Sequence, residues 1–273
     1  MLLRRSLIKK TSILGFTYQD LKFIFNFCKM NIRDRYLGSS LGSVWAVLNP
    51  LLMLGIYTFV FGYVFKSKLP GSDTTLSYAI WLISGYGPWL AINESIMSAT
   101  TSVVSGAGLI KNIAFKTEVL PVASSLVGFV PLAVSILFLL ILLVIDGNLP
   151  TWHVIIVIPV TIILFWFIIA ISFFLSAINV FIRDVSVILP NLLMMLLFAT
   201  PIFYPLKLVP GILQIASQAN PFYILAEAYR ECILNHNIPN LIALGYVLLI
   251  SYIIYFMGLK FFQRLKGYFD AFL

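Results

Sequence analysis

Long apolar stretches separated by short polar segments dominate the pattern of the chain. A helix needs about 20 consecutive apolar residues to cross a hydrocarbon core about 30 Å thick. We predict an all-α integral membrane protein with six transmembrane helices, at residues 44–65, 76–99, 119–145, 154–182, 185–206 and 241–259. These runs define a membrane domain over residues 44–262, preceded by an N-terminal region (1–43) and followed by a short tail (263–273).

A seventh uncharged stretch, residues 208–226, lacks the pattern of a spanning helix. It contains Pro210 and Pro221 and closely follows Pro201 and Pro205. Each proline disrupts the backbone hydrogen bonding of a helix, which lipid cannot replace. We therefore predict that residues 207–236 form a re-entrant segment, or surface helices, that returns to the side of the membrane it left.

The residues before the first predicted span have the pattern of an amphipathic helix. Apolar residues recur at helical spacing on one face, and basic or amide residues occupy the opposite face. The apolar face consists of Leu21, Ile24, Phe25, Cys28 and Ile32. The polar face consists of Lys22, Asn26, Lys29 and Arg33. We predict an N-terminal amphipathic helix in the membrane interface. A soluble helix packed on a partner is the alternative, and both can hold together.

Composition supports the membrane class, and the distribution of charge predicts the orientation. Apolar residues make up 61% of the chain and charged residues 10%, too little polarity to cover a soluble globule. With six spans, fourteen of the eighteen Lys and Arg residues fall on one side. The positive-inside rule places that side, with both termini, in the cytoplasm. The net charge of +8 therefore indicates orientation in a cytoplasmic (inner) membrane and contact with anionic lipid, rather than nucleic-acid binding.

The sequence contains none of the common signatures of catalysis or cofactor binding. It has neither a phosphate loop for a nucleoside triphosphate nor a complete nucleophile elbow. His153 and His236 are far apart in the sequence, and no cluster has metal-ligand spacing, so we expect no metal site. Cys28 and Cys232 fall on opposite sides of the membrane in the six-span topology and cannot pair. A membrane glycosyl- or acyltransferase is therefore disfavoured.

Motifs at the predicted membrane boundaries carry a resemblance to a known family. The string RDRYLGSSLGSVW (33–45) precedes Asn49-Pro50, and the spacing of Gly38 and Gly42 permits close approach of two helices. Further motifs follow in order: LIKN (109–112), FKTEVLP (115–121), Asn179 with Arg183-Asp184, TPIFY (200–204), and Asn220-Pro221 with Arg230. From about residue 18 to 267 the chain resembles the ABC-2 type permeases that export O-antigens, capsular polysaccharides and teichoic acids. It departs from them at Lys116, where relatives often have proline.

The resemblance implies a transport permease rather than an enzyme. It implies a homodimer that pairs with two ATP-binding cassette subunits and exports a lipid-linked polysaccharide, O-antigen being favoured. ATP and Mg would bind to those partners, and this chain would need no cofactor. Teichoic acid or capsular polysaccharide export is an alternative within the family. A stand-alone channel or scaffold with the same topology is an alternative outside it.

The family's cytoplasmic loop docks on the ATP-hydrolysing subunit, which implies coupling roles for residues at the cytoplasmic side. These candidates are Arg33, Asp34, Arg35, Leu109, Ile110, Lys111, Phe115, Lys116, Glu118, Arg183 and Asp184. In the alternative interpretation, Lys111 and Lys116 only enforce topology, and Glu118 suits the positive end of the third helix.

Two features within the predicted spans are candidates for the transport pathway. Tyr57, Phe61 and Phe65 share one face of the first span, where their rings would stack on sugars. Helix packing or lipid contact explains this stripe equally well. Glu94 is an ionisable residue in an apolar run, a costly position, and lies either at membrane depth or near a polar, hydrated end. Other aromatic residues are expected in interfacial belts: Trp81, Tyr86, Trp89, Trp152 and Tyr204.

Overall fold

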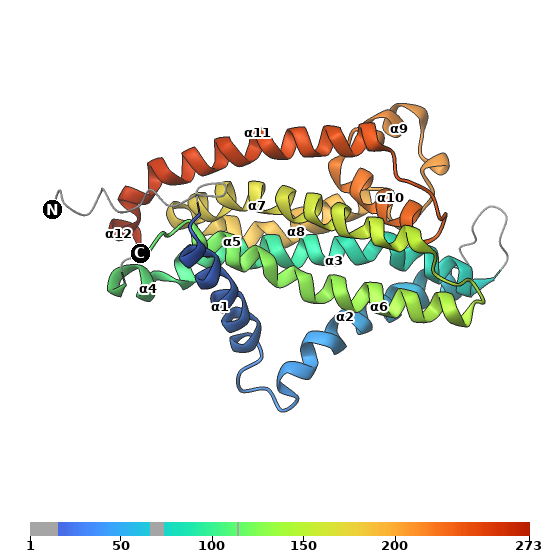
Figure 1. Cartoon of the computed structure of the whole chain (residues 1–273), viewed down its shortest axis with the longest axis horizontal. Helices are drawn as coiled ribbons and strands as arrows, with labels where there is room; N and C mark the ends of the chain where they lie inside the picture. The colour runs from blue at the N-terminus through green and yellow to red at the C-terminus, as the bar shows by residue number, and fades with distance from the viewer. Residues whose placement is uncertain (1–15, 66–73, 114) are drawn as a thin grey trace.

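The computed structural model describes residues 16–65, 74–113 and 115–273. The elements of the described residues are all helices, and the long ones run along the long axis of the molecule (Figure 1). The prediction of an all-α fold is confirmed. We call the left end in Figure 1, with α4 (Ala107–Asn112) and α12 (Phe269–Phe272), the α4 end. The right end, with α10 (Pro221–Ile233), is the α10 end.

The N-terminal helix, α1 (Tyr18–Asp34), begins at a capping box. The Thr17 side chain accepts a hydrogen bond from the backbone of Asp20, and the Asp20 carboxylate accepts one from the backbone of Thr17. This reciprocal pair satisfies two amides that the first turn leaves without helical partners. Ile24 and Phe27 are the buried residues of α1. The helix therefore packs on the bundle rather than standing apart from it.

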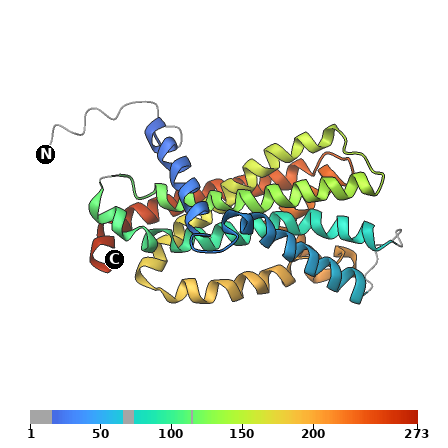
Figure 2. The same ribbon diagram turned by 90° about the horizontal axis from the view of Figure 1, so that it is seen from below.

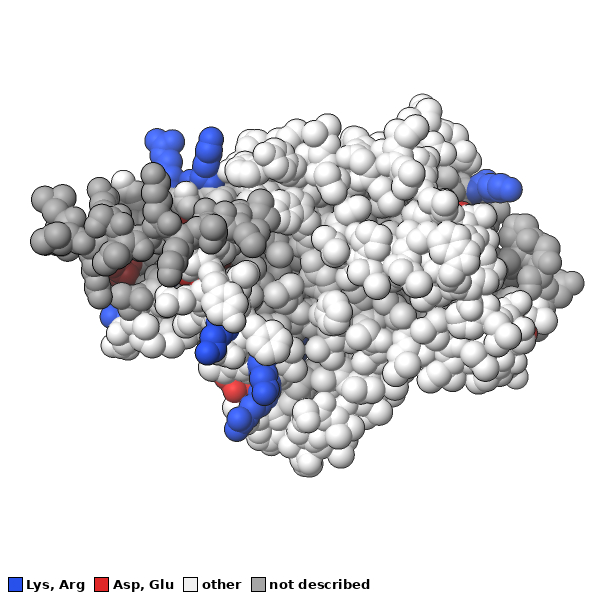
Figure 3. Space-filling view, in the orientation of Figure 1, with Lys and Arg blue, Asp and Glu red and all other residues white. Residues whose placement is uncertain are grey.

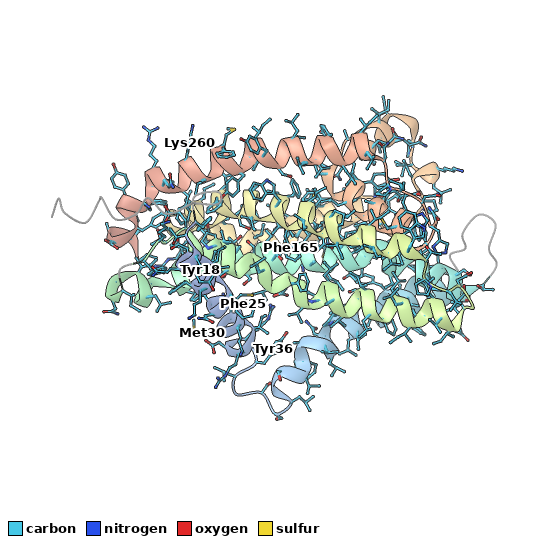
Figure 4. All side chains as sticks on the ribbon, in the orientation of Figure 1. Tyr18, Phe25, Met30, Tyr36, Phe165 and Lys260 are labelled. Carbon is cyan, nitrogen blue, oxygen red and sulfur yellow. The ribbon has the colours of Figure 1, made fainter. Side chains whose placement is uncertain are left out.

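The face by which α1 packs differs from its predicted apolar face. Only Ile24 of that predicted face is buried, whereas Leu21 and Phe25 are exposed. Tyr18 and Met30 are exposed as well, and Figure 4 labels both along α1 with Phe25. The helix thus has a packed side and an additional exposed apolar side. An interface helix needs such an exposed apolar side, so this side is compatible with a location in the membrane interface. That location stays a prediction.

A sharp elbow joins α1 to the first span (Figure 1). Gly38 and Gly42 lie in this elbow with φ angles of +85° and +51°, and nothing lies within 4 Å of the position of a Cβ on either glycine. The two glycines therefore form a turn that other residues rarely adopt. Within the described residues of this chain no atom approaches the two glycines, so a close helix contact at this spacing stays a prediction.

Five of the six predicted spans correspond to long helical stretches of the structure. The last of them continues beyond the predicted residue 259, because its apolar positions repeat up to Leu265. The stretches are η1, α2 and η2 (Gly42–Val44, Trp45–Tyr57, Thr58–Val64); α3 (Thr75–Ser105); α5, η3 and α6 (Val119–Ser125, Leu126–Gly128, Phe129–Ile145); η4 and α7 (Trp152–Ile156, Val157–Phe181); and α11 (Leu241–Leu265).

The fifth predicted span, residues 185–206, is shorter in the structure. Helix α8 (Asp184–Ala199) lies along one edge of the bundle (Figure 2) and ends at Thr200, whose backbone is extended. Pro201 explains this end, because its ring disfavours helical backbone in the residue before it. The prediction that this helix extends to residue 206 is therefore wrong.

Between α8 and α11 the chain forms short helices at the α10 end. They are η5 (Leu206–Leu208), α9 (Gly211–Gln218) and α10, and Figure 1 shows that α8 ends and α11 begins at this same end. Helix α10 packs against α3 and α7. A segment that returns to the end it left is what the prolines of this region predict, although its position relative to a membrane stays a prediction.

Helix α3 is the central helix of the bundle. It packs against α5, α6, α7 and α10, and most of its length is buried. Tyr86 and Trp89 are 4% and 3% exposed, so their predicted place in an interfacial belt is wrong. They lie inside because neighbouring helices surround α3 on nearly every side.

Four helical stretches are long and apolar enough to cross a membrane by length and composition. They are Gly42–Val64, Val119–Ile145, Trp152–Phe181 and Leu241–Phe272. Helix α3 is long but carries many polar residues, and α8 is apolar but has 16 residues. The count of six spans therefore stays a prediction. Many large apolar side chains face outward on these helices, as expected for a surface in contact with lipid.

Gly128 permits a close crossing of η3 and α3, and we expect Gly128→Val to destabilise the bundle. A Cβ at this position would collide with Ser95 Oγ and the Ala91 carbonyl oxygen. Overpacking of this kind costs about 1–3 kcal/mol. Thermal unfolding of the detergent-purified protein measures the effect. Gly245→Val is the matched control, because nothing lies within 4 Å of a Cβ there. Equal melting temperatures for the two variants would contradict the crossing.

Candidate functional site

The predicted coupling loop lies at the α4 end. Leu109 and Ile110 belong to α4 and pack with part of their surface on an apolar cluster formed by α1, α3, α5, α7, α11 and α12. Lys111 is exposed in the last turn of the same helix. Helix α4 therefore has one side fixed to the bundle and one side free. Such a short helix can pass a force from a docked protein into the bundle.

After α4, the chain contacts α1 through a ring stack and an ion pair. The rings of Phe115 and Phe23 stack with their centroids 5.0 Å apart. Lys116 Nζ donates to Asp20 Oδ2 at 2.7 Å. Asp20 thus caps α1 and binds the loop with the same oxygen atom. The partners are far apart in the sequence, so only the fold brings them together.

The charge of Asp20 is well suited to this contact. Partial burial by itself raises the pKa of Asp20, but hydrogen bonds from Lys116 and Thr17 outweigh burial, and the pKa is lowered from its ordinary value. A carboxylate with a lowered folded-state pKa stabilises the fold above its unfolded pKa, and this stability is lost as the pH falls through the folded value. The pair is therefore intact at neutral pH and weakens only in acid.

Glu118, two residues further on, contacts the C-terminal segment. Its Oε1 atom accepts a hydrogen bond from Lys266 Nζ at 2.5 Å, and its side chain is 5% exposed. Lys266 begins η6 (Lys266–Tyr268) directly after α11. Glu118 precedes the first residue of α5 but makes no side-chain hydrogen bond to the start of that helix. The contact with Lys266 therefore fixes the Glu118 side chain, in addition to its favourable position before the start of α5.

The remaining coupling candidates lie on exposed surface. Arg33 and Asp34 are exposed at the end of α1. Arg183 and Asp184 are exposed where α7 turns into α8, at the α4 end (Figure 2). The structure does not bring these four residues into the ion pairs of the loop. Their role in coupling stays a prediction.

Arg35 and Glu94 form an ion pair between the elbow and the bundle. Glu94 belongs to α3, and both residues line a cavity of about 180 Å³ together with Tyr36, Asn49 and Asn93. A group from before the first span therefore reaches Glu94. This contact compensates the charge of Glu94, as an ionisable residue in an apolar run requires, and its depth in the membrane stays a prediction. A role in the transport pathway stays a prediction.

The predicted aromatic stripe divides into a packed part and an exposed part. The rings of Tyr57 and Phe61 each stack on Phe203 with centroids 4.8 Å apart. Tyr86 adds an edge contact to Tyr57 at 4.8 Å. Phe65, at the end of the stripe, is 66% exposed. Tyr57 and Phe61 thus cover the TPIFY motif, which contains Phe203, and both interpretations of the stripe stay open.

Sequence reasoning named Arg230 only as part of a motif with Asn220-Pro221 and missed its contacts in the fold. Arg230 is 2% exposed. It donates hydrogen bonds to the carbonyl oxygens of Pro201 (3.3 Å) and Ile202 (2.7 Å) and to Glu227 Oε2 (3.0 Å). Its guanidinium also lies 3.9 Å from the ring centroid of Trp81. Trp81 is half-buried, and its place in an interfacial belt stays a prediction.

Two more side chains hold the same break after α8. Tyr78 donates its hydroxyl hydrogen to the carbonyl oxygen of Phe203 at 2.9 Å, and Asn220 Nδ2 donates to Thr200 Oγ1 at 3.0 Å. The TPIFY motif is therefore fixed by α3, by Asn220 and by α10. The available signal was the spacing of Arg230 three residues after Glu227, which places opposite charges on one helix face, because a buried charge requires partners.

The structure brings His153 and His236 together although they are far apart in the sequence. Thr151 Oγ1 lies 3.1 Å from His153 Nδ1 and 3.0 Å from His236 Nδ1. The described residues contain no group of three or more His, Cys, Asp or Glu side chains that could hold a metal ion. The contact therefore links two loops rather than forming a recognisable metal centre.

Comparison with known proteins identifies the family of this arrangement. Residues 24–234 match the ABC-2 type transporters. The chain belongs to the ABC-2 type transporter family. The match begins within α1 and ends after α10, and so includes the predicted coupling loop, Glu94, the aromatic stripe and Arg230. As an ABC-2 type transporter, the chain is a multi-pass membrane transport protein.

Individual relatives of this ABC-2 type transporter resemble it over most of its length. It is 27% identical to the O-antigen export system permease protein RfbA of Klebsiella pneumoniae over 262 residues. This alignment covers 95% of this chain and 96% of the relative. A protein of the same name from Myxococcus xanthus is 26% identical over 225 residues (82% and 84%). The polysialic acid transport protein KpsM of Escherichia coli is 24% identical over 242 residues (85% and 89%).

Proposed function

We propose that this chain is the membrane subunit of an ATP-driven ABC exporter that moves a lipid-linked polysaccharide, O-antigen first, out of the cytoplasm. The similarity to an O-antigen export permease over 95% of the chain carries this proposal. Similarity that extends from the N-terminal helix to the C-terminal helices supports a shared transport role better than similarity of one motif would.

The source of energy follows from the chemistry of the chain. Its sequence has no phosphate loop, so ATP and Mg would bind to a separate subunit. The exposed side of α4 at Lys111 is the position at which that subunit would dock, and Arg33, Asp34, Arg183 and Asp184 are further exposed positions that it would contact. All of them lie on exposed loops or helix ends, where docking requires no rearrangement of the core.

The proposed assembly is a homodimer with two ATP-binding subunits in a cytoplasmic (inner) membrane. On the face shown in Figure 3, most of the visible Lys and Arg side chains lie in the left half, which includes the α4 end and the region of α1, and one projects at the right. By the positive-inside rule the α4 end and both termini would face the cytoplasm. A reporter enzyme fused after Leu273 tests this orientation. Reporter activity on the non-cytoplasmic side of the membrane would contradict it.

A second candidate substrate is an acidic capsular polysaccharide. The similarity to a polysialic acid transport protein over 85% of the chain supports it. The two candidates share one mechanism and differ in the polymer, so the same experiment separates them.

Deletion of this chain tests the proposed function. The deletion strain is expected to lose its surface polysaccharide and to accumulate the lipid-linked polymer inside the cell. Mass spectrometry of the retained polymer identifies the substrate. The wild-type chain should restore export only with an ATP-binding subunit whose phosphate-loop lysine is intact. Export that persists without this chain, or that is restored with the inactive ATP-binding subunit, would overturn the proposal.

A further inference from the structure

The loop after α4 is held from two opposite ends of the chain. Lys116 binds Asp20 on the N-terminal helix at 2.7 Å, and Glu118 binds Lys266 after the last long helix at 2.5 Å. Only Thr117 separates the two residues. The partners of one short loop therefore lie 96 residues before it and 148 residues after it in the sequence.

Apolar contacts support each ion pair. On the N-terminal side, Phe115 stacks on Phe23, and Asn31 Nδ2 donates to Ser124 Oγ at 2.9 Å, which ties α1 to α5. On the C-terminal side, Phe269 is 1% exposed, and its ring packs 5.3 Å from that of Phe262. Both sides belong to one apolar cluster with α5. The loop, α1 and the end of α11 are therefore packed as one unit.

Burial separates the residues of the loop into two groups. Glu118 is almost fully buried and its Oε2 atom has no hydrogen-bond partner, so burial leaves its carboxylate little access to another protein. Lys116 is partly exposed, but its amine already contacts Asp20. Lys111 and Asn112 of α4 are exposed. The exposed residues of α4 can contact a partner, whereas the two ion pairs can only fix how the loop sits on the bundle.

We propose that Lys116 and Glu118 are positioning residues that join the ATPase-facing loop to α1 and to the end of α11, so that a displacement of α4 moves both helices. This inference rests on the proposed function. Through the elbow, α1 continues into the first span, which carries Tyr57 and Phe61. The Lys116–Asp20 pair thus connects the loop to the aromatic cluster at TPIFY, and the Glu118–Lys266 pair connects it to the helix that packs on α7.

Two double-mutant cycles in the complete exporter test the proposal. The first contains Asp20→Asn, Lys116→Met and their combination, and the second contains Glu118→Gln, Lys266→Met and their combination. These changes remove charge but keep most of the side-chain volume, and Asn still has an oxygen to cap α1. Lys260→Met is the matched control, because Lys260 is exposed on α11. Each complex, purified with its ATP-binding subunit, is assayed in proteoliposomes for assembly, ATP hydrolysis and polymer exported.

Each single variant is expected to assemble and hydrolyse ATP, but to export at least about fivefold less polymer per ATP, the lower range of coupling between two sites. The double variant of each pair should be no worse than its singles, because both remove the same contact. Lys260→Met should match the wild type. Additive losses within a pair, or unchanged export per ATP, would overturn the inference.

A merely structural role predicts a different result. Assembly, ATP hydrolysis and export would then fall together, and export per ATP would stay constant, which would also overturn the inference. The wild-type complex distinguishes failure of the proposed function from failure of the positioning role. If it shows no ATP-dependent export at all, the proposed function itself fails, whereas normal wild-type export with fully coupled variants removes only the positioning role.

Discussion

Replacement of Arg230 by Met is expected to lower the melting temperature of the purified protein by about 5–10 °C and to abolish export. The variant loses the hydrogen bonds to Pro201, Ile202 and Glu227 and the contact with Trp81. Two buried carbonyl groups would lose the donor that Arg230 supplies, each at about 1–3 kcal/mol. A total of about 3 kcal/mol corresponds to roughly 5–10 °C for a chain of this size.

Two further variants make this expectation specific. Lys207→Met removes an exposed cation from the same region and should leave the melting temperature unchanged within about 1 °C, because exposed charges contribute little. Gly85→Ala keeps Arg230 but places a Cβ against its guanidinium, so it should reproduce part of the loss. A melting temperature for Arg230→Met equal to that of the wild type would show that the break after α8 is held by other contacts.

The apolar runs predicted the positions of most helices because lipid-facing helices must be apolar along their whole outer surface. Helix α3 shows both the strength and the limit of this signal. Its run at 76–99 was recognised, yet its serines, Asn93 and Glu94 make it less apolar than its neighbours. The helix tolerates them because protein surrounds it. A helix surrounded by protein can carry polar residues, so hydropathy alone marks α3 less strongly than the helices that face outward.

The sequence predicted which residues form the candidate site but not their contacts, and the role of the site stays a prediction. The motifs at 109–121 mark the loop that we predict to dock on the ATP-binding subunit. The ion pairs of Lys116 and Glu118 join positions about 100 residues or more apart, and a single sequence contains no information about such distant partners. The buried contacts of Arg230 escaped prediction for a related reason. A charge count assigns each arginine to a side of the membrane, whereas a buried arginine is defined by the carbonyl groups it meets.

The aromatic stripe provides the second large expected effect. The double variant Tyr57→Leu, Phe61→Leu is expected to reduce polysaccharide export at least about tenfold, a loss of about 1.4 kcal/mol, while the complex still assembles. Leucine retains apolar volume against Phe203, so packing is largely kept. It removes the flat rings on which the C–H faces of sugars would stack. Export and assembly are measured on the same membranes.

Phe65→Leu is the matched control for this variant, because Phe65 lies on the same stripe but is mostly exposed. Among the described residues its ring contacts that of Phe61 and not that of Phe203. If the stripe contacts glycan along its whole length, Phe65→Leu should also reduce export. If only the part at TPIFY matters, Phe65→Leu should match the wild type. If assembly and export fall together in the Tyr57→Leu, Phe61→Leu variant, the glycan interpretation is contradicted. The two rings would then act only in helix packing, through their stacking on Phe203.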